Sequence, residues 1–203
     1  MSKTASENPL TSSSVDFSKR LEPPGGILVW LIVILELITF AAGIGVYLAQ
    51  QRAHPEEFVA GAATLNQPLA FANTMLLLTG GWCMAVAIAS LHEGREKLGR
   101  LWIQGAIFTG VAFMILKLVE WSEKIRHGAS FGEDHFYTAY FALTGFHFLH
   151  VFVAVLILAY LCYALKRGRY SATNYFDIES GGIFWHMCDL IWLLLYPAIY
   201  LLS

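Results

Sequence analysis

The chain has 203 residues, of which 57% are hydrophobic and 14% are charged, and its formal net charge is −2. Its mean hydropathy of +0.56 lies outside the balance expected of a soluble globular domain. The small net charge gives no reason to expect a nucleic-acid partner. This composition is typical of an integral membrane protein.

Five apolar stretches follow one another along the chain. Each reaches or nearly reaches the ~20 residues that an α-helix needs to cross a bilayer. They are Ile27–Ala49, Leu69–Leu91, Leu101–Val119, Thr138–Leu165 and Ile183–Leu202. Within a bilayer, a helix satisfies its own backbone hydrogen bonds. The sequence therefore predicts an all-α polytopic membrane protein, a bundle of five transmembrane helices with no separate soluble domain.

A polar segment precedes the first stretch and ends in Pro23-Pro24-Gly25-Gly26. It lacks the short apolar core and small-residue cleavage site of a secretory signal. We expect residues 1–26 to be a flexible cytoplasmic tail that ends in a helix-start signal. Residues 27–203 are then the five-helix membrane domain, and the longest connection, Gln50–Pro68, is expected to be a loop along the outer surface.

Lysine and arginine are unevenly divided between the two sides of the predicted bundle. Nine lie in the tail and in the second and fourth loops: Lys3, Lys19, Arg20, Arg95, Lys97, Arg100, Lys166, Arg167 and Arg169. Three lie in the first and third loops: Arg52, Lys124 and Arg126. Because basic residues favour cytoplasmic loops, the N-terminus is predicted to be cytoplasmic and the C-terminus to lie outside.

The first and third stretches carry acidic side chains. Glu36 lies near the middle of the first, where a charge costs ~2.5–3.5 kcal/mol. It should face the bundle interior, as a proton or lipid-headgroup site or as a structural hydrogen bond between helices. Lys117 and Glu120 lie near the end of the third stretch, beside Trp121. A long side chain can snorkel there and an indole favours the interface, so we expect Lys117 and Trp121 to be interfacial anchors.

The fourth stretch carries two histidines three residues apart. His147 and His150 therefore share a helix face, beside the small Gly145, which would allow close approach of another helix. The pair could bind a metal with ligands from other helices, or one histidine could bind a haem. Hydrogen-bonded structural histidines are the favoured interpretation.

The fifth stretch repeats this spacing in His186 and Asp189, which follow Trp185, expected to be a third interfacial anchor. An acid and an imidazole on one face can share a proton and lower the cost of burying each other. The three cysteines lie in or beside apolar stretches without Cys-x-x-Cys spacing, so they predict neither disulfides nor a metal site. We find no phosphate-binding glycine loop and no nucleophile elbow, and we predict no catalytic residue.

Five short motifs, in order on the five stretches, resemble the subunit III family of haem–copper oxidases. The most specific is Thr144-Gly145-Phe146-His147-Phe148-Leu149-His150-Val151, which resembles the T-G-F-H-x-x-H-V helix of that family. The segment from Trp185 to Trp192, with Tyr200-Leu201, resembles its final W-H-x-x-D-x-x-W helix. The others are Glu36-Leu37 with Thr39-Phe40-Ala41-Ala42, Asn73-Thr74-Met75-Leu76-Leu77-Leu78-Thr79, and Glu120-Trp121.

The resemblance implies a non-catalytic accessory subunit in a bacterial inner membrane. Such a subunit packs against a haem–copper catalytic subunit, holds phospholipid in a cleft, and supports stability and proton uptake. It has no cofactor of its own, because haem and metal belong to the partner. Glu36 would be the family's buried carboxylate. Interhelical bonding and support of the lipid cleft would fall to Glu120, His147, His150, His186 and Asp189.

The partner enzyme can be specified further in two ways, and two functions of other classes stay open. Three segments in order look most like the subunit III-like accessory protein of bacterial nitric oxide reductase. They are Lys117–Trp121 with Lys124-Ile125, then Thr144–His150, then Trp185-His186-Met187. A third subunit of a cytochrome c or quinol oxidase is the alternative. Glu36 with the histidines could instead form the path of a proton or small-solute transporter. In a further interpretation, His147 and His186 bind a haem within this chain.

Overall fold

The computed structural model describes residues 23–132, 134–170 and 174–202. In these ranges the chain forms six helices: α2 (Gly26–Ala53), α3 (Pro55–Ala63), α4 (Gln67–His92), α5 (Glu96–Arg126), α6 (His135–Lys166) and α7 (Phe176–Tyr200). Five of these described helices, all except α3, are long and apolar enough to cross a membrane. The predicted all-α, five-span fold is confirmed. Of the predicted tail, residues 1–22 lie outside the described residues.

Most of the membrane helices extend beyond the apolar stretches that predicted them. The last begins at Phe176 instead of Ile183, and the third continues to Arg126. Polar side chains cap two of the starts: Asn66 accepts a hydrogen bond from the Leu69 amide at 3.0 Å, and Asp134 accepts one from the Phe136 amide at 2.6 Å. The apolar runs therefore predict most of each membrane helix, and polar caps mark the starts of α4 and α6.

The long first connection is not only a loop, because it contains α3. Pro55 stands in the first turn of this helix, and the acidic Glu56 and Glu57 follow it, near the positive end of the helix dipole. Phe58 is fully buried, with its ring 5.1 Å from that of Tyr47 and 5.5 Å from that of Phe136. The expectation of a loop was therefore wrong, since the segment forms a helix that Phe58 packs onto the bundle.

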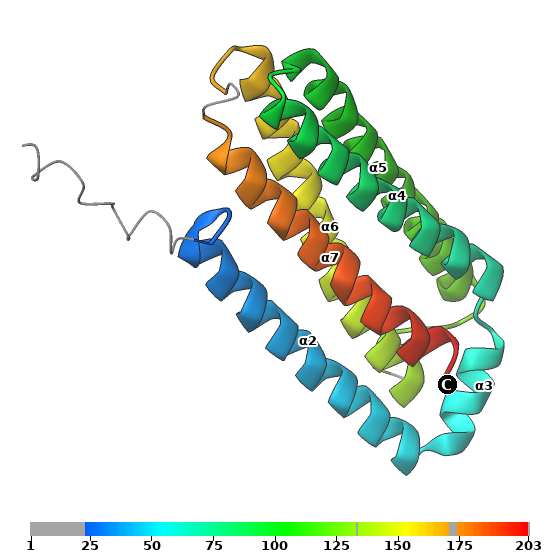
Figure 1. Cartoon of the computed structure of the whole chain (residues 1–203). Coiled ribbons are helices and arrows are strands. Elements are labelled where there is room, and N and C mark those ends of the chain that lie inside the picture. Colours follow the sequence, from blue (N-terminus) through cyan, green and yellow to red (C-terminus); the bar gives the residue numbers. More distant parts are fainter. Residues whose placement is uncertain (1–22, 133, 171–173, 203) are drawn as a thin grey trace, which may run out of the picture.

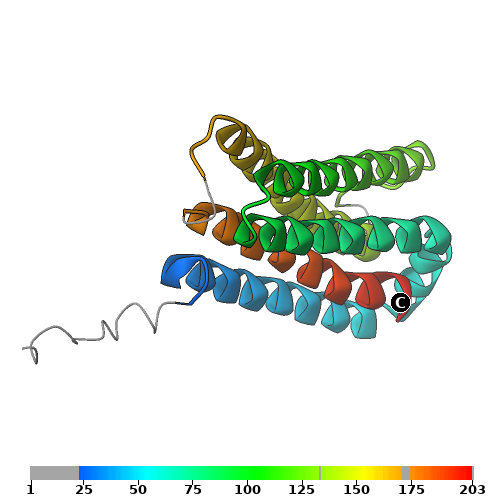
Figure 2. The ribbon, with the colours of Figure 1, turned by 45° about the horizontal axis from the view of Figure 1, so that its top comes forward.

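The membrane helices form a four-helix body with one helix at its edge. In Figures 1 and 2, α4 and α5 lie side by side, α6 and α7 complete the body, and α2 runs along the outside of α6 and α7. Only 17% of the most apolar window of α2 is buried, against 56% for α7. The α2 helix is therefore peripheral and α7 central.

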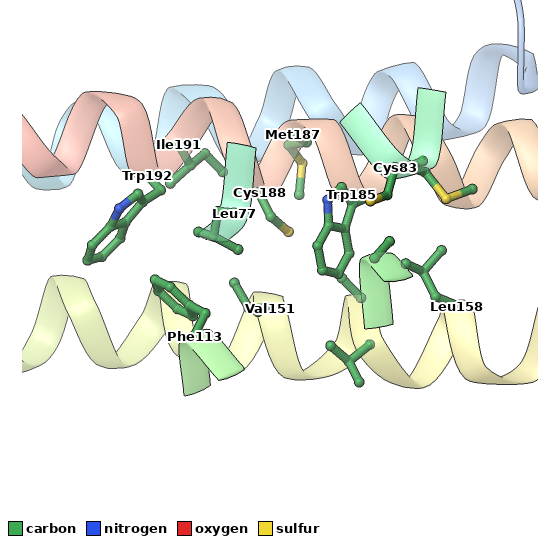
Figure 3. Close-up of a cluster of buried hydrophobic side chains, with 14 of the residues drawn as sticks. Leu77, Cys83, Phe113, Val151, Leu158, Trp185, Met187, Cys188, Ile191 and Trp192 are labelled. Carbon is green, nitrogen blue, oxygen red and sulfur yellow. The ribbon is translucent and has the colours of Figure 1, made fainter. Parts of the chain in front are cut away.

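Glycines on two neighbouring helices leave room for a large aromatic side chain in the core. Trp185 is fully buried and points from α7 toward the other helices (Figure 3). A Cβ atom at Gly80 would lie 2.8 Å from its ring, and one at Gly110 would lie 2.6 Å away. The expected position of Trp185 at the membrane interface was therefore wrong. The close approach expected at Gly145 was also wrong, because a Cβ there would meet only the Trp121 ring, at 4.0 Å.

Candidate functional site

A buried ion pair lies between α5, α6 and α7. The side chains of Lys117 and Glu120 are fully buried, and Nζ of Lys117 lies 3.0 Å from Oε2 of Glu120. The same ammonium group donates to the hydroxyl of Tyr200 at 2.6 Å and to that of Tyr140 at 3.2 Å. Both hydroxyls donate in turn to Oε1 of Glu120, at 2.7 and 2.9 Å. Each charge is therefore surrounded by groups that compensate it.

The interfacial position predicted for Lys117 was wrong. Its Nζ also lies over the rings of Tyr140 and Trp192, 4.9 and 5.2 Å from their centroids. Cation–π contacts gain strength where water is excluded. The side chain turns inward because acceptors on two other helices meet it. Trp121, the neighbouring predicted anchor, is partly buried, with its ring 5.1 Å from that of Phe148.

His147 is enclosed by aromatic rings. Its imidazole stacks on Trp192 at a centroid distance of 5.2 Å, and the ring of Phe113 meets it edge-on at 5.8 Å. Among the described residues, neither of its ring nitrogens has a hydrogen-bond partner. The expected hydrogen bonding of His147 was therefore wrong, and the residue packs as an aromatic ring.

His150, one turn later, contacts the edge helix instead. Its Nε2 lies 3.1 Å from Oε2 of Glu36, and its Nδ1 lies 2.8 Å from the Phe146 carbonyl. The side chains of His150 and Glu36 are 12% and 21% exposed. The two side chains bring α2 and α6 together at an ion-pair distance, but Oε2 of Glu36 has no hydrogen-bond partner among the described residues. The structural hydrogen bond between helices and the proton or lipid-headgroup site both stay predictions for Glu36.

The predicted acid–imidazole pair on α7 is present but open to the surface. Nδ1 of His186 lies 3.5 Å from Oδ2 of Asp189, with side-chain exposures of 46% and 8%. The other carboxyl oxygen, Oδ1, has no hydrogen-bond partner among the described residues. The pair lines a pocket of about 340 Å³ between α4 and α7.

A haem bound between His147 and His186 would need both imidazoles to face one site. His147 lies among Phe113 and Trp192, inside the bundle. His186 instead faces the open pocket beside α4. The two side chains therefore have separate surroundings, and this geometry does not favour a haem held between them.

A third group of polar side chains, which sequence reasoning missed, joins the start of α3 to the start of α6. Oε2 of Glu57 accepts hydrogen bonds from the backbone amide of His135 at 3.1 Å and interacts with its ring Nδ1 at 3.0 Å. These contacts lower the pKa of Glu57 below its ordinary value. The sequence predicts a loop around Glu57 and gives no signal of its approach to His135.

His54 completes this group, and its three side chains could each offer one ligand atom to a metal. The rings of His54 and His135 are stacked, however, with centroids 3.8 Å apart and planes 10° apart. An imidazole binds a metal in the plane of its ring, and two parallel planes do not converge on one ion. The arrangement suits a hydrogen-bonded connection between α3 and α6 better than a metal site.

Comparison with known proteins assigns the chain to a family. The chain matches the family described as "Cytochrome c oxidase subunit III" over residues 53–203, which includes α3 to α7. It is similar to cytochrome c oxidase subunit 3 of Bacillus sp. (strain PS3), with 28% identity over 180 residues, 86% of this chain and 84% of that protein. Cytochrome bo(3) ubiquinol oxidase subunit 3 of Pseudomonas aeruginosa is 24% identical over 174 residues, 86% of this chain and 83% of that protein.

A third relative is longer. The protein named "Heme-copper oxidase subunit I+III", from Aeropyrum pernix, is 26% identical over 182 residues, which are 85% of this chain and 22% of that protein. The family match covers every residue of the candidate site described above except Glu36. The chain belongs to the cytochrome c oxidase subunit III family.

Proposed function

We propose that the chain is a non-catalytic accessory subunit that binds the catalytic subunit of a haem–copper respiratory complex. In this role it supports assembly, stability, lipid retention and proton uptake. The observation that carries the proposal is the family match over residues 53–203. The name of the Aeropyrum protein, which combines subunits I and III, supports a catalytic subunit as the partner.

The geometry of the polar residues supports a structural role. The pair of Lys117 and Glu120 is closed by two tyrosine hydroxyls, and Glu36 is paired with His150 on another helix. These groups are engaged with one another, as expected of residues that hold helices together. Glu36 and His150 lie where α2 meets the body, and we propose this junction as the place where phospholipid is held.

The partner enzyme has two candidates. The relatives described above are named as subunits of cytochrome c, ubiquinol and haem–copper oxidases, which favours an oxidase. The run Lys117-Leu118-Val119-Glu120-Trp121 motivates a nitric oxide reductase as the second candidate. The uneven division of lysine and arginine supports a cytoplasmic N-terminus and an outside C-terminus in a bacterial inner membrane.

The test is purification of the affinity-tagged chain from native membranes in mild detergent. We expect a catalytic subunit in near-equal amount, identified by mass spectrometry and by a reduced-minus-oxidised haem spectrum. Recovery of the chain without any haem–copper subunit would overturn the proposal. Proton or solute flux in liposomes that is lost in Glu36→Gln would favour the transporter instead.

A further inference from the structure

We propose that the catalytic subunit docks on the face between α4 and α7, through a transmembrane helix that brings a hydrogen-bond donor to Asp189. This inference rests on the proposed function and names the surface that serves it. The docking face is defined by six residues, Leu78, Trp82, His186, Asp189, Leu190 and Leu193, which line one pocket.

The docking face lies at the depth where polar groups cost most. Gly81 on α4, which lies beside both His186 and Asp189, is near the middle of the apolar stretch Leu69–Leu91, about 15 Å from Leu91 at ~1.5 Å per residue. That distance is half of a ~30 Å hydrocarbon core. The side chain of His186 is 46% exposed on the outside of the bundle. An ionisable group at this depth normally faces protein or a water-filled cavity, so its exposure indicates that another polypeptide covers it.

Asp189 provides the second, independent observation. Its side chain is only 8% exposed, and it lines the same pocket. Its Oδ1 has no hydrogen-bond partner among the described residues, and its contact with His186 is long, at 3.5 Å. A buried acceptor left without a donor costs about 1–3 kcal/mol. The chain alone therefore leaves an unmet requirement at Oδ1, which is itself buried. We infer that the Asp189 side chain turns toward the pocket that it lines when a hydroxyl, amide or indole N–H from the partner enters there.

Gly81 leaves room beside the other carboxyl oxygen of Asp189, Oδ2. A Cβ atom at Gly81 would collide with the carboxylate of Asp189. The preceding Gly80 makes room for the buried ring of Trp185 instead. Gly80 thus leaves room for a core side chain, and Gly81 leaves room beside the carboxyl group of Asp189.

The rim of the pocket fits a transmembrane helix. Leu78, Leu190 and Leu193 are 38%, 45% and 40% exposed, and Trp82 is 57% exposed. Apolar side chains around one buried polar contact are the usual composition of packed helices in membranes, where polar side chains bond across the interface. Lipid tails could cover the rim, but they offer no donor to Asp189. The polar centre therefore favours a protein helix over lipid.

Site-specific photo-crosslinking tests the docking face in the complex purified from native membranes. A photo-reactive benzoylphenylalanine replaces Leu193 on the docking face or, as the matched control, Phe152 on α6, which is 43% exposed. We expect Leu193 to capture the catalytic subunit more efficiently than Phe152. If the catalytic subunit co-purifies but Leu193 captures only lipid or a second copy of this chain, the docking face is wrong and the proposed function stands. If no catalytic subunit co-purifies, both fall.

Substitutions test the hydrogen bond itself. We expect Asp189→Leu to weaken retention of the catalytic subunit by roughly three- to twentyfold, the range for one intramembrane hydrogen bond. Asp189→Asn keeps an acceptor oxygen and should retain more of the partner. Thr39→Leu on α2 is the control, because the exposed Thr39 hydroxyl already donates to the Leu35 carbonyl at 2.9 Å. Equal retention by Asp189→Leu and Thr39→Leu would overturn the inference.

Discussion

Two acid–base pairs with the same spacing have opposite surroundings in this bundle. Lys117 and Glu120 are three residues apart on α5, and His186 and Asp189 are three residues apart on α7. The first pair is fully buried and its carboxylate receives hydrogen bonds from two tyrosines. The second is open on one side, and one of its oxygens lacks a partner among the described residues.

The difference shows that helical spacing brings two side chains together but does not determine their role. Tyr140 and Tyr200, from two other helices, close the pair on α5. Beside Asp189, α4 offers Gly81, which has no side chain to donate. We therefore assign the closed pair, Lys117–Glu120, to the stability of the chain and the open pair, His186–Asp189, to its association.

The largest effect should come from breaking the closed pair. Lys117→Met leaves Glu120 buried without its cation, and loss of one partner from a buried pair typically costs about 3–5 kcal/mol. We expect a loss of this size in the free energy of unfolding of the purified chain in mixed micelles. Unchanged stability would show that the pair does not hold the fold together.

The double variant Lys117→Met/Glu120→Gln is the control for this prediction. It removes both charges and keeps an oxygen that can accept from the two tyrosines. We expect it to recover part of the stability lost in the single variant, because no uncompensated charge stays buried. A double variant less stable than Lys117→Met would contradict the account.

The neighbouring glycines Gly80 and Gly81 of α4 allow the bundle core and the open pocket to be tested separately. Gly80→Ala should destabilise the isolated chain by about 1–3 kcal/mol, because the added methyl group overpacks both the Thr109 hydroxyl and the buried ring of Trp185. Gly81→Ala meets the end of the Asp189 side chain at the open pocket, which can move, so we expect less loss of stability but weaker retention of the partner. Thermal unfolding and co-purification measure the two effects.

Gly45→Ala is the reference for both glycine variants. A Cβ at Gly45 would meet no neighbouring atom within 4 Å, so the substitution causes no clash. We expect it to raise the free energy of unfolding by about 0.5–1 kcal/mol, because alanine has the higher helix propensity. If Gly80→Ala were as stable as Gly45→Ala, the tight packing of Trp185 would not contribute as we describe.

Glu36 and His150 form an intermediate case that sharpens the comparison. Their side chains are mostly buried but not enclosed, and they join the peripheral α2 to α6. We expect a double-mutant cycle of Glu36→Gln and His150→Ala to give a coupling energy of about 0.6 kcal/mol, with about 1.7 kcal/mol as the upper range. A coupling as large as the whole loss expected for Lys117→Met would remove the distinction between closed and partly open pairs.

The smallest effect concerns the exposed contact of Glu57 with His135. Because folding lowers the pKa of Glu57 below 4.5, its contribution is present above that pH and is lost as the pH falls through the lower, folded value. We expect the protection of the α3 backbone amides, taken relative to the intrinsic exchange rate at each pH, to fall below about pH 4.5, and to fall less in Glu57→Gln. An equal fall of this protection in both proteins would rule out Glu57 as its source.

The sequence predicts the parts of this structure that depend on one segment at a time. Apolar length predicted the five membrane helices, and three-residue spacing predicted the contact of His186 with Asp189. The burial of Lys117 depends on Tyr140 and Tyr200, which are distant in the chain, so spacing alone suggested snorkelling.

The other errors have the same physical origin. Trp185 is buried because Gly80 and Gly110 on two other helices make room for it. The helix α3 depends on the packing of Phe58 against rings of α2 and α6. In each case, residues remote in sequence determine the outcome.

One paired measurement tests the central claim most directly. Lys117→Met and Asp189→Leu are compared in two assays, unfolding of the isolated chain and retention of the catalytic subunit after purification from native membranes. We predict that Lys117→Met lowers the stability of the isolated chain, whereas Asp189→Leu leaves that stability close to the wild-type value and reduces retention. If Asp189→Leu destabilised the isolated chain as much as Lys117→Met while retention by the folded fraction stayed unchanged, the two pairs would share one structural role, contrary to this account.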